Sequence, residues 1–205
     1  MAYDPRLHHR RSIRLHGHDY AGGGAYFVTI CTRGKKCLFG EIVEGSMILN
    51  EAGSLVQRVW DTLPQRFGSL VLDAFQMMPN HLHAIFVLPG PGLEPALAVA
   101  TGAPVIQPSA TRRGRACPTL LDPAAMYNAG TASRPPTKMG DVVGAFKSIS
   151  TIAINKLMSH PGARPLHENF YEHIIRDTGE LEMIRDYIIH NPQRWLEDPE
   201  NPDLT

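Results

Sequence analysis

The sequence is poor in cysteine and has no long apolar run. Its three cysteines, Cys31, Cys37 and Cys117, are odd in number and lack the Cys-x-x-Cys spacing of redox and zinc sites. We therefore expect a reducing, cytoplasmic location, without a disulfide framework or a cysteine-built zinc site. No stretch approaches the roughly 20 apolar residues that span a bilayer, and the N-terminus carries no apolar signal segment. The sequence predicts a protein that does not associate with membranes.

Net charge is also absent, because 20 basic residues balance 20 acidic ones over 205 residues. Whole-chain charge therefore gives no indication of a polyanionic partner. The charge is nevertheless unevenly distributed: the first twenty residues hold four arginines and four histidines against two aspartates. This asymmetry permits a local basic surface. A hydrophobic content of 43% at this length predicts one globular domain over residues 1–205.

Hydrophobic periodicity predicts alternating strands and helices. Strands are expected where β-branched and aromatic residues cluster, and helices where apolar residues recur every three or four positions. The predicted strands are 25–32, a hairpin over 38–50 turning at residues 44–46, 70–78, 81–89 and 170–177. The predicted helices are 50–64 with Asn50 as N-cap, 139–159, and 178–192 ended by Pro192.

Residues 89–137 interrupt this regularity. Pro, Gly, Ala, Ser and Thr dominate there and no period is visible, which predicts a flexible insertion. The remaining elements predict an α+β fold of ferredoxin-like or RRM-like type. It would have an antiparallel sheet of about four or five strands and two main helices on one face.

Two histidines stand in the most apolar strand, MMPNHLHAIFVLPG. Side chains alternate along a strand, so His81 and His83 share one face and their rings can converge on one metal ion. For such a pair inside an apolar strand, a purely structural role is about as plausible as metal binding, because burying two imidazoles has a desolvation cost. The pair alone specifies no reaction, since zinc hydrolases use it too.

The last predicted helix carries Tyr187 and Asn191, which lie four residues apart on one helical face. Taken by itself, this face has an ordinary interpretation: Tyr187 is a tyrosine at the edge of the core and Asn191 a helix C-cap before Pro192. Beside a histidine pair, the same residues would supply a phenol and a third ligand with an oxygen donor. The sequence leaves both interpretations open at this point.

Several motifs in order resemble a known family. MMPNHLHAIFVLP resembles the HUH motif (His-hydrophobic-His) of single-strand DNA endonucleases, and FYEHIIRD followed by IRDYIIHNP resembles the C-terminal signature of REP-associated tyrosine transposases. RRSIRL, DYAGGGAYFVTICT and GDVVGAFKS also resemble the start and the middle helix of those proteins. The resemblance extends from Arg10 to about Leu196, apart from the insertion.

The resemblance implies a function and a site. His81 and His83 would be metal ligands, Asn191 the third ligand, and Tyr187 the nucleophile that cleaves and rejoins single-stranded hairpin DNA of the REP type through a 5′-phosphotyrosyl intermediate. The cofactor would be a divalent ion, Mg or Mn, although nitrogen ligands also suit transition metals. Tyr171 in FYEHIIRD is the rival nucleophile, but on a strand it has no ligand-type neighbour on a helical face. Tyr26 is expected in the core.

Substrate contacts would come from basic residues outside the metal site. The candidates are Arg10, Arg11, Arg14, Lys35, Lys36 and Lys147. For each of them singly, ordinary solvated charge is an equally good interpretation. We expect a nucleoid-associated protein of the cytoplasm that acts as a monomer in preference to a homodimer.

Two other functions remain open from the sequence. The chain could be a non-catalytic nucleic-acid-binding module of the same fold. It could also be a metal-dependent phosphoesterase in which a metal-activated water attacks and Tyr187 is only structural.

Overall fold

The structure is a computed structural model, and it describes residues 23–90, 93, 97, 100–101 and 138–204. Four strands form its main sheet, which is antiparallel throughout with the order β4-β5-β1-β6. They are β1 (Gly24–Cys31), β4 (Val71–Met77), β5 (His81–Leu88) and β6 (Tyr171–Ile175). The predicted insertion at 89–137 and the predicted DNA contacts Arg10, Arg11 and Arg14 lie largely or wholly outside the described residues.

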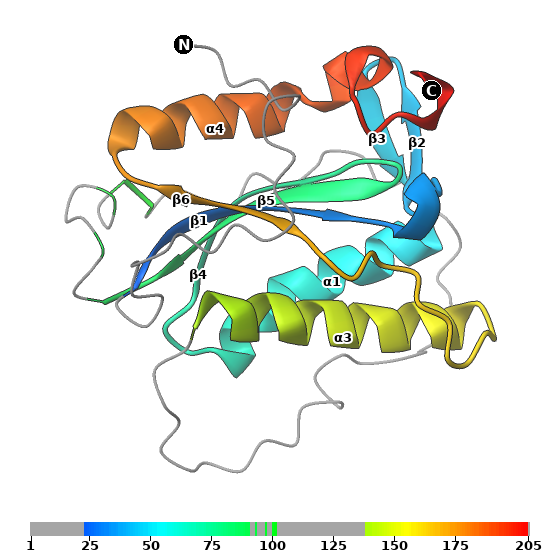
Figure 1. The fold of residues 1–205 in the computed structure, drawn as a ribbon, viewed down its shortest axis with the longest axis horizontal. Helices are drawn as coiled ribbons and strands as arrows, with labels where there is room; N and C mark the ends of the chain where they lie inside the picture. The colour runs from blue at the N-terminus through cyan, green and yellow to red at the C-terminus, as the bar shows by residue number, and fades with distance from the viewer. Residues whose placement is uncertain (1–22, 91–92, 94–96, 98–99, 102–137, 205) are drawn as a thin grey trace.

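In the part of the chain that the structure describes, three long helices pack on the two faces of this sheet. Helices α1 (Glu51–Arg66) and α3 (Met139–Leu157) lie together on one face, and α4 (Thr178–His190) lies on the other (Figure 1). Helix α1 connects β1 to β4, and α3 connects β5 to β6. The main elements therefore follow the β-α-β-β-α-β order of a ferredoxin-like fold. The predicted α+β class and the two main helices on one face are confirmed.

Local signals explain where the elements begin and turn. The Asn50 side chain accepts a hydrogen bond of 2.9 Å from the Gly53 amide and so caps α1, as predicted. The hairpin of β2 (Gly40–Val43) and β3 (Ser46–Leu49) forms a separate two-stranded sheet. Its two turn residues, Glu44 and Gly45, both have positive φ, which is typical of the type I′ turn that matches strand twist.

Strand alternation divides the core into two layers. On β5, Leu82, Ala84, Phe86 and Leu88 join the core beneath α1 and α3, whereas Ile85 and Val87 join the core beneath α4. Tyr26 is fully buried in the α1/α3 layer, as expected. Because His81 and His83 have the same parity as Ile85 and Val87, they belong to the face that α4 covers. None of the described helices is both long and apolar enough to span a membrane.

The chain after α4 continues in short turns. Helix α4 ends at His190, close to the predicted stop at Pro192, and Pro192 then begins a 3-10 helix, η4 (Pro192–Glu197). Pro fits the first turn of a helix because its missing N–H would have no intrahelical partner there. A further short 3-10 turn, η5 (Pro202–Leu204), follows. These turns fold the C-terminal segment back toward the start of β5, where Asn80 contacts the Glu200 carbonyl.

Candidate metal centre

His81 and His83 converge on the sheet face beneath α4, as the strand pattern predicted. Their Nε2 atoms are 3.1 Å apart and their ring centroids 4.7 Å apart. His81 is fully buried and His83 is 4% exposed. Two ligands of one ion, each about 2.1 Å from it, are at most about 4.2 Å apart. The two imidazole nitrogens meet this condition without any movement.

A carboxylate completes the cluster. Asp198, which follows η4, places Oδ2 3.6 Å from Nε2 of His81, and one ligand atom each from Asp198, His81 and His83 lie within 4.8 Å of one another. This bound is within about 1 Å of the limit of about 4.2 Å, so Asp198 would bind the ion directly, after a shift of less than about 1 Å, or through a water. Two imidazoles and a carboxylate form a donor set that suits a divalent ion.

The electrostatics of the cluster also fit a cation. Burial lowers the pKa of His83 to about 3 and the pKa of His81 well below its usual value, so both rings are neutral near pH 7. Burial raises the pKa of Asp198 to about 6, which leaves most of it ionised near pH 7. A buried carboxylate beside two neutral rings is costly without a counter-charge. A divalent ion would supply that charge, and metal binding requires neutral imidazole.

Tyr187 reaches the same place from α4. Its ring centroid is 5.2 Å from that of His83 and 6.2 Å from that of Phe27, with both pairs edge to face. Burial, together with the charges of Asp198 and Glu200, raises the pKa of the Tyr187 phenol to about 12, while a hydrogen bond with the Asn191 side chain opposes the shift. The phenol is therefore a weak nucleophile unless a positive charge offsets Asp198.

Asn191 is the C-cap of α4 and is 3% exposed. Both sequence interpretations of this residue thus remain compatible with its placement. Its side-chain Oδ1 is buried and has no hydrogen-bond partner among the described residues. A buried amide oxygen without a partner is unfavourable, and a ligand such as a metal ion would satisfy it. The role of Asn191 as third ligand stays a prediction.

Asp198 is not among the site residues that the sequence predicted. A local signal was nevertheless present, because EDPENPD combines Asp, Asn and Pro at the spacing of successive turns. Such a signal predicts that the chain reverses, but not that the reversal ends at the histidines. That contact depends on the docking of α4 and η4.

The predicted DNA-contacting lysines lie in different surroundings. The Lys35 ammonium donates to the Pro199 carbonyl at 2.8 Å and pairs with Glu200 at 3.5 Å, so it holds the C-terminal segment near the cluster. Lys36 is exposed. Lys147, on α3, donates to the Glu168 carbonyl at 2.6 Å on the other side of the sheet from the histidines. Contact of any of the three with DNA stays a prediction.

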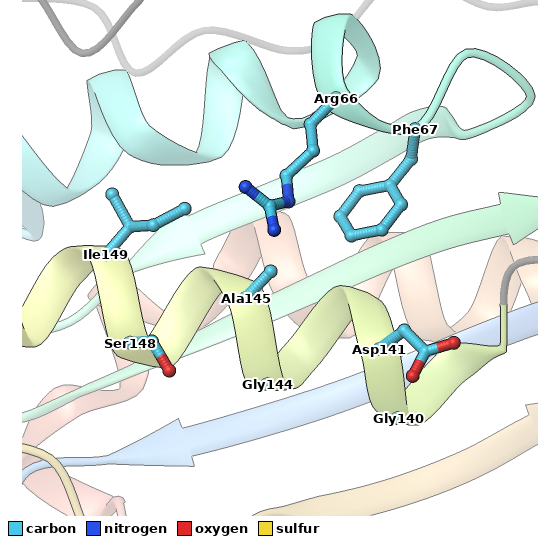
Figure 2. Close-up of a pocket in the computed structure, with 8 residues that line it drawn as sticks. All are labelled: Arg66, Phe67, Gly140, Asp141, Gly144, Ala145, Ser148 and Ile149. Carbon is cyan, nitrogen blue, oxygen red and sulfur yellow. The ribbon is translucent and has the colours of Figure 1, made fainter. Parts of the chain in front are cut away.

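A pocket of about 540 Å³ lies apart from the cluster. Arg66 and Phe67 from the end of α1 and Gly140, Asp141, Gly144, Ala145, Ser148 and Ile149 from α3 line it (Figure 2). It belongs to the α1/α3 layer, so the sheet separates it from the histidine pair. None of the residues that line it is among the predicted site residues.

Comparison with known proteins finds a relative that matches nearly the whole chain. No protein-family model matches the sequence. An uncharacterized protein of Haemophilus influenzae is 34% identical over 196 residues, which cover 96% of this chain and 95% of that protein. The chain belongs to the family of that protein. This family membership does not identify an activity, because the relative is itself uncharacterized.

Two solved structures show weaker likeness. One is a REP-associated tyrosine transposase bound to a REP hairpin, with a TM-score of 0.49, 17% identity, and coverage of 86% of this chain and 71% of that one. The other is a candidate transposase of Deinococcus radiodurans, with a TM-score of 0.38, 15% identity, and coverage of 86% and 94%. Both TM-scores lie below 0.5, so neither likeness establishes an activity.

The burial of this cluster predicts how the free energy of unfolding depends on pH. A histidine whose pKa is lowered by folding takes up a proton more readily when unfolded, so each of His81 and His83 removes up to about 1.4 kcal/mol of stability per pH unit as pH falls below about 6.5. Asp198, with its raised pKa, acts in the opposite direction between about pH 6 and 4. We expect a net loss of about 1.4 kcal/mol per pH unit over that range.

Urea unfolding of the protein in a metal chelator, at several pH values, measures this slope. His83→Asn removes one titrating ring and should abolish most of the net slope. A stability that is constant between about pH 6 and 4 in the wild type would contradict the burial of two neutral imidazoles.

Proposed function

We propose that this protein is a metal-dependent transposase or endonuclease of single-stranded DNA, with Tyr187 as nucleophile. The observation that carries the proposal is the approach of a tyrosine on α4 to a buried His-His-Asp cluster on β5 and after η4. The motif order described above supports the same reaction. The residues fit a divalent ion, Mg or Mn, held by His81, His83 and Asp198, with the Oδ1 atom of Asn191 as a further donor.

A bound divalent ion would act as a Lewis acid on the anionic scissile phosphate. The protein's own residues would do the rest. The Tyr187 phenol loses its proton to a base or water, and its Oη forms a bond to phosphorus while the bond from phosphorus to the 3′-oxygen breaks. The electron pair of that bond stays on the 3′-oxygen, which takes up a proton. The products are a 5′-phosphotyrosyl adduct and a free 3′-hydroxyl, which can reverse the step with another strand.

The proposed partner is single-stranded DNA that contains a hairpin, as the motif resemblance implies. Lys35 and Lys36 lie on the chain beside the C-terminal segment and are the described candidates for phosphate contacts near the cluster. The three chain segments that form the cluster belong to one copy, so no second copy is needed to complete it. This supports a monomer. We propose that it acts as a single domain in the cytoplasm, at the nucleoid, where its DNA partner lies.

The test is a search for a covalent protein–DNA adduct. Single-stranded hairpin DNA, labelled at either end, is incubated with the protein and Mg²⁺ or Mn²⁺, and the products are separated under denaturing conditions. We expect an adduct with the downstream fragment through its 5′-phosphate, a free 3′-hydroxyl on the upstream fragment, and no reaction in chelator. A hairpin of unrelated sequence and a fully duplex DNA serve as matched controls.

A metal-dependent phosphoesterase is the second candidate, because the raised pKa of Tyr187 disfavours attack by the phenol and leaves room for attack by water. Cleavage without any adduct would favour this second candidate and overturn the proposal. If the protein binds the DNA but does not cleave it with either metal ion, the proposed function is wrong. The protein is then a non-catalytic nucleic-acid-binding module.

A further inference from the structure

His81 and His83 face each other through their Nε2 atoms, and their Nδ1 atoms contact other residues. These Nδ1 contacts decide which nitrogen of each ring carries the proton. Nδ1 of His81 is 2.8 Å from Oδ1 of Asn80, and Nδ1 of His83 is 2.8 Å from Oγ1 of Thr29. Asn80 is 1% exposed in the turn before β5. Thr29 lies on β1 directly opposite His83 in the strand pairing. The two partners differ chemically, because an amide oxygen only accepts hydrogen bonds whereas a hydroxyl donates or accepts.

The orientation of the Asn80 amide is fixed by the main chain. Its Nδ2 atom lies 2.6 Å from the Glu200 carbonyl and 3.2 Å from the Lys35 carbonyl. Two carbonyl oxygens require a donor, so the NH₂ group must point toward them and Oδ1 toward His81. His81 must then carry its proton on Nδ1 and donate it to Asn80. Nε2 of His81 then has a free lone pair, which points into the space between the His81 and His83 rings.

The short distance between the two Nε2 atoms then assigns the proton of His83. Two lone pairs would repel each other at 3.1 Å, so in the metal-free protein His83 must carry its proton on Nε2 and donate it to His81. In that state Thr29 donates its hydroxyl proton to Nδ1 of His83. With an ion between the rings, both Nε2 atoms need free lone pairs, and His83 must carry its proton on Nδ1.

We propose that Asn80 is a positioning residue that keeps His81 permanently in the metal-binding tautomer, while Thr29 lets His83 exchange tautomers when the metal enters. The His83 ring loses its proton from Nε2 and gains one at Nδ1 by exchange with water, so it is neutral before and after. Thr29 keeps its contact with Nδ1 of His83 in both states, because its hydroxyl can rotate from donor to acceptor. Asn80 cannot make such a change without losing its contacts with two carbonyls.

The inference rests on the metal-binding part of the proposed function, but it does not depend on DNA cleavage. The tautomers are measured by two-bond proton–nitrogen NMR of the ¹⁵N-histidine-labelled full chain, first in chelator and then with Zn²⁺ as a diamagnetic probe. In chelator we expect protons on Nδ1 of His81 and on Nε2 of His83. With Zn²⁺ we expect His83 to move its proton to Nδ1 and His81 to stay unchanged.

Three variants separate positioning from folding. Asn80→Ala removes the acceptor and should weaken Zn²⁺ binding by about 10- to 100-fold with a mixture of His81 tautomers in chelator. Asn80→Asp keeps an acceptor and should keep the His81 proton on Nδ1. Asn155→Ala removes another asparagine that donates to a carbonyl, that of Ala163, outside the cluster. It should change neither the tautomers nor Zn²⁺ affinity.

A proton on Nε2 of His81 in chelator, or a His81 tautomer that does not respond to Asn80→Ala, would overturn the inference. So would an unchanged His83 on Zn²⁺ saturation. If the chelator result is as expected and no metal binds, the role of Asn80 on His81 stands, and the metal-driven exchange of His83 and the metal-dependent function both fail. If Zn²⁺ binds as expected and hairpin DNA is not cut, only the proposed function fails.

Discussion

Tyr187→Phe is expected to abolish the covalent adduct and to lower DNA cleavage by about 10³-fold or more, since the nucleophilic oxygen is removed. Phe keeps the ring and therefore the edge-to-face contacts with His83 and Phe27. The stability of the folded protein should thus change by less than about 1 kcal/mol. Zn²⁺ affinity should be retained, because the phenol lies outside the His-His-Asp cluster.

Denaturing gels and single-turnover cleavage rates measure the first effect, and urea unfolding measures the second. Tyr171→Phe is the matched control: Tyr171 lies on β6 and packs against the same core beneath α4, so it meets similar surroundings. If Tyr171→Phe loses the adduct and Tyr187→Phe retains it, the assignment of the nucleophile is wrong. Cleavage that survives in Tyr187→Phe at the wild-type rate would point to attack by water.

Arg185→Met is expected to destabilise the fold by about 3–5 kcal/mol, the usual cost of leaving a buried charge without its partner. The Arg185 guanidinium binds both carboxylate oxygens of Asp73, with Nε 2.8 Å from Oδ1, and it also donates to the Ala100 carbonyl at 2.9 Å. Asp73 is 4% exposed at an irregularity in the pairing of β4 with β5. This contact ties α4 to the sheet two residues before Tyr187.

Urea unfolding of the single and double variants measures the coupling. Glu182→Gln is the matched control, because Glu182 also pairs with Arg185 but is two-thirds exposed, and its loss should cost less than about 1 kcal/mol. The double variant Asp73→Asn, Arg185→Met removes both charges and should recover much of the stability. A loss below about 1 kcal/mol in Arg185→Met would show that the pair does not hold α4 in place.

The elements of the fold were accessible from local patterns. Asn50 marked the start of α1, Glu44 and Gly45 marked the β2–β3 turn, and the strand period placed His81 and His83 on one face. The i, i+4 spacing likewise placed Tyr187 and Asn191 on one side of α4. Each of these features depends on residues a few positions apart, where backbone geometry alone fixes direction.

The composition of the cluster was accessible only in part. The sequence named two of its members, but Asp198 enters through two contacts that no local pattern encodes. One is the docking of α4 on the face opposite α1 and α3, which the Asp73–Arg185 pair stabilises. The other is the return of the C-terminal segment, which Lys35 and Asn80 hold through the carbonyls of Pro199 and Glu200.

By itself, then, the sequence determined the strand with its histidine pair and the helix with its tyrosine, because periods of 2 and 3.6 residues are properties of the backbone. Only the tertiary structure decided that the two meet, that a carboxylate joins them, and that Asn80 sets the proton of His81. Those outcomes depend on which helix covers which face of the sheet. That choice is made by packing and buried ion pairs between residues far apart in the chain.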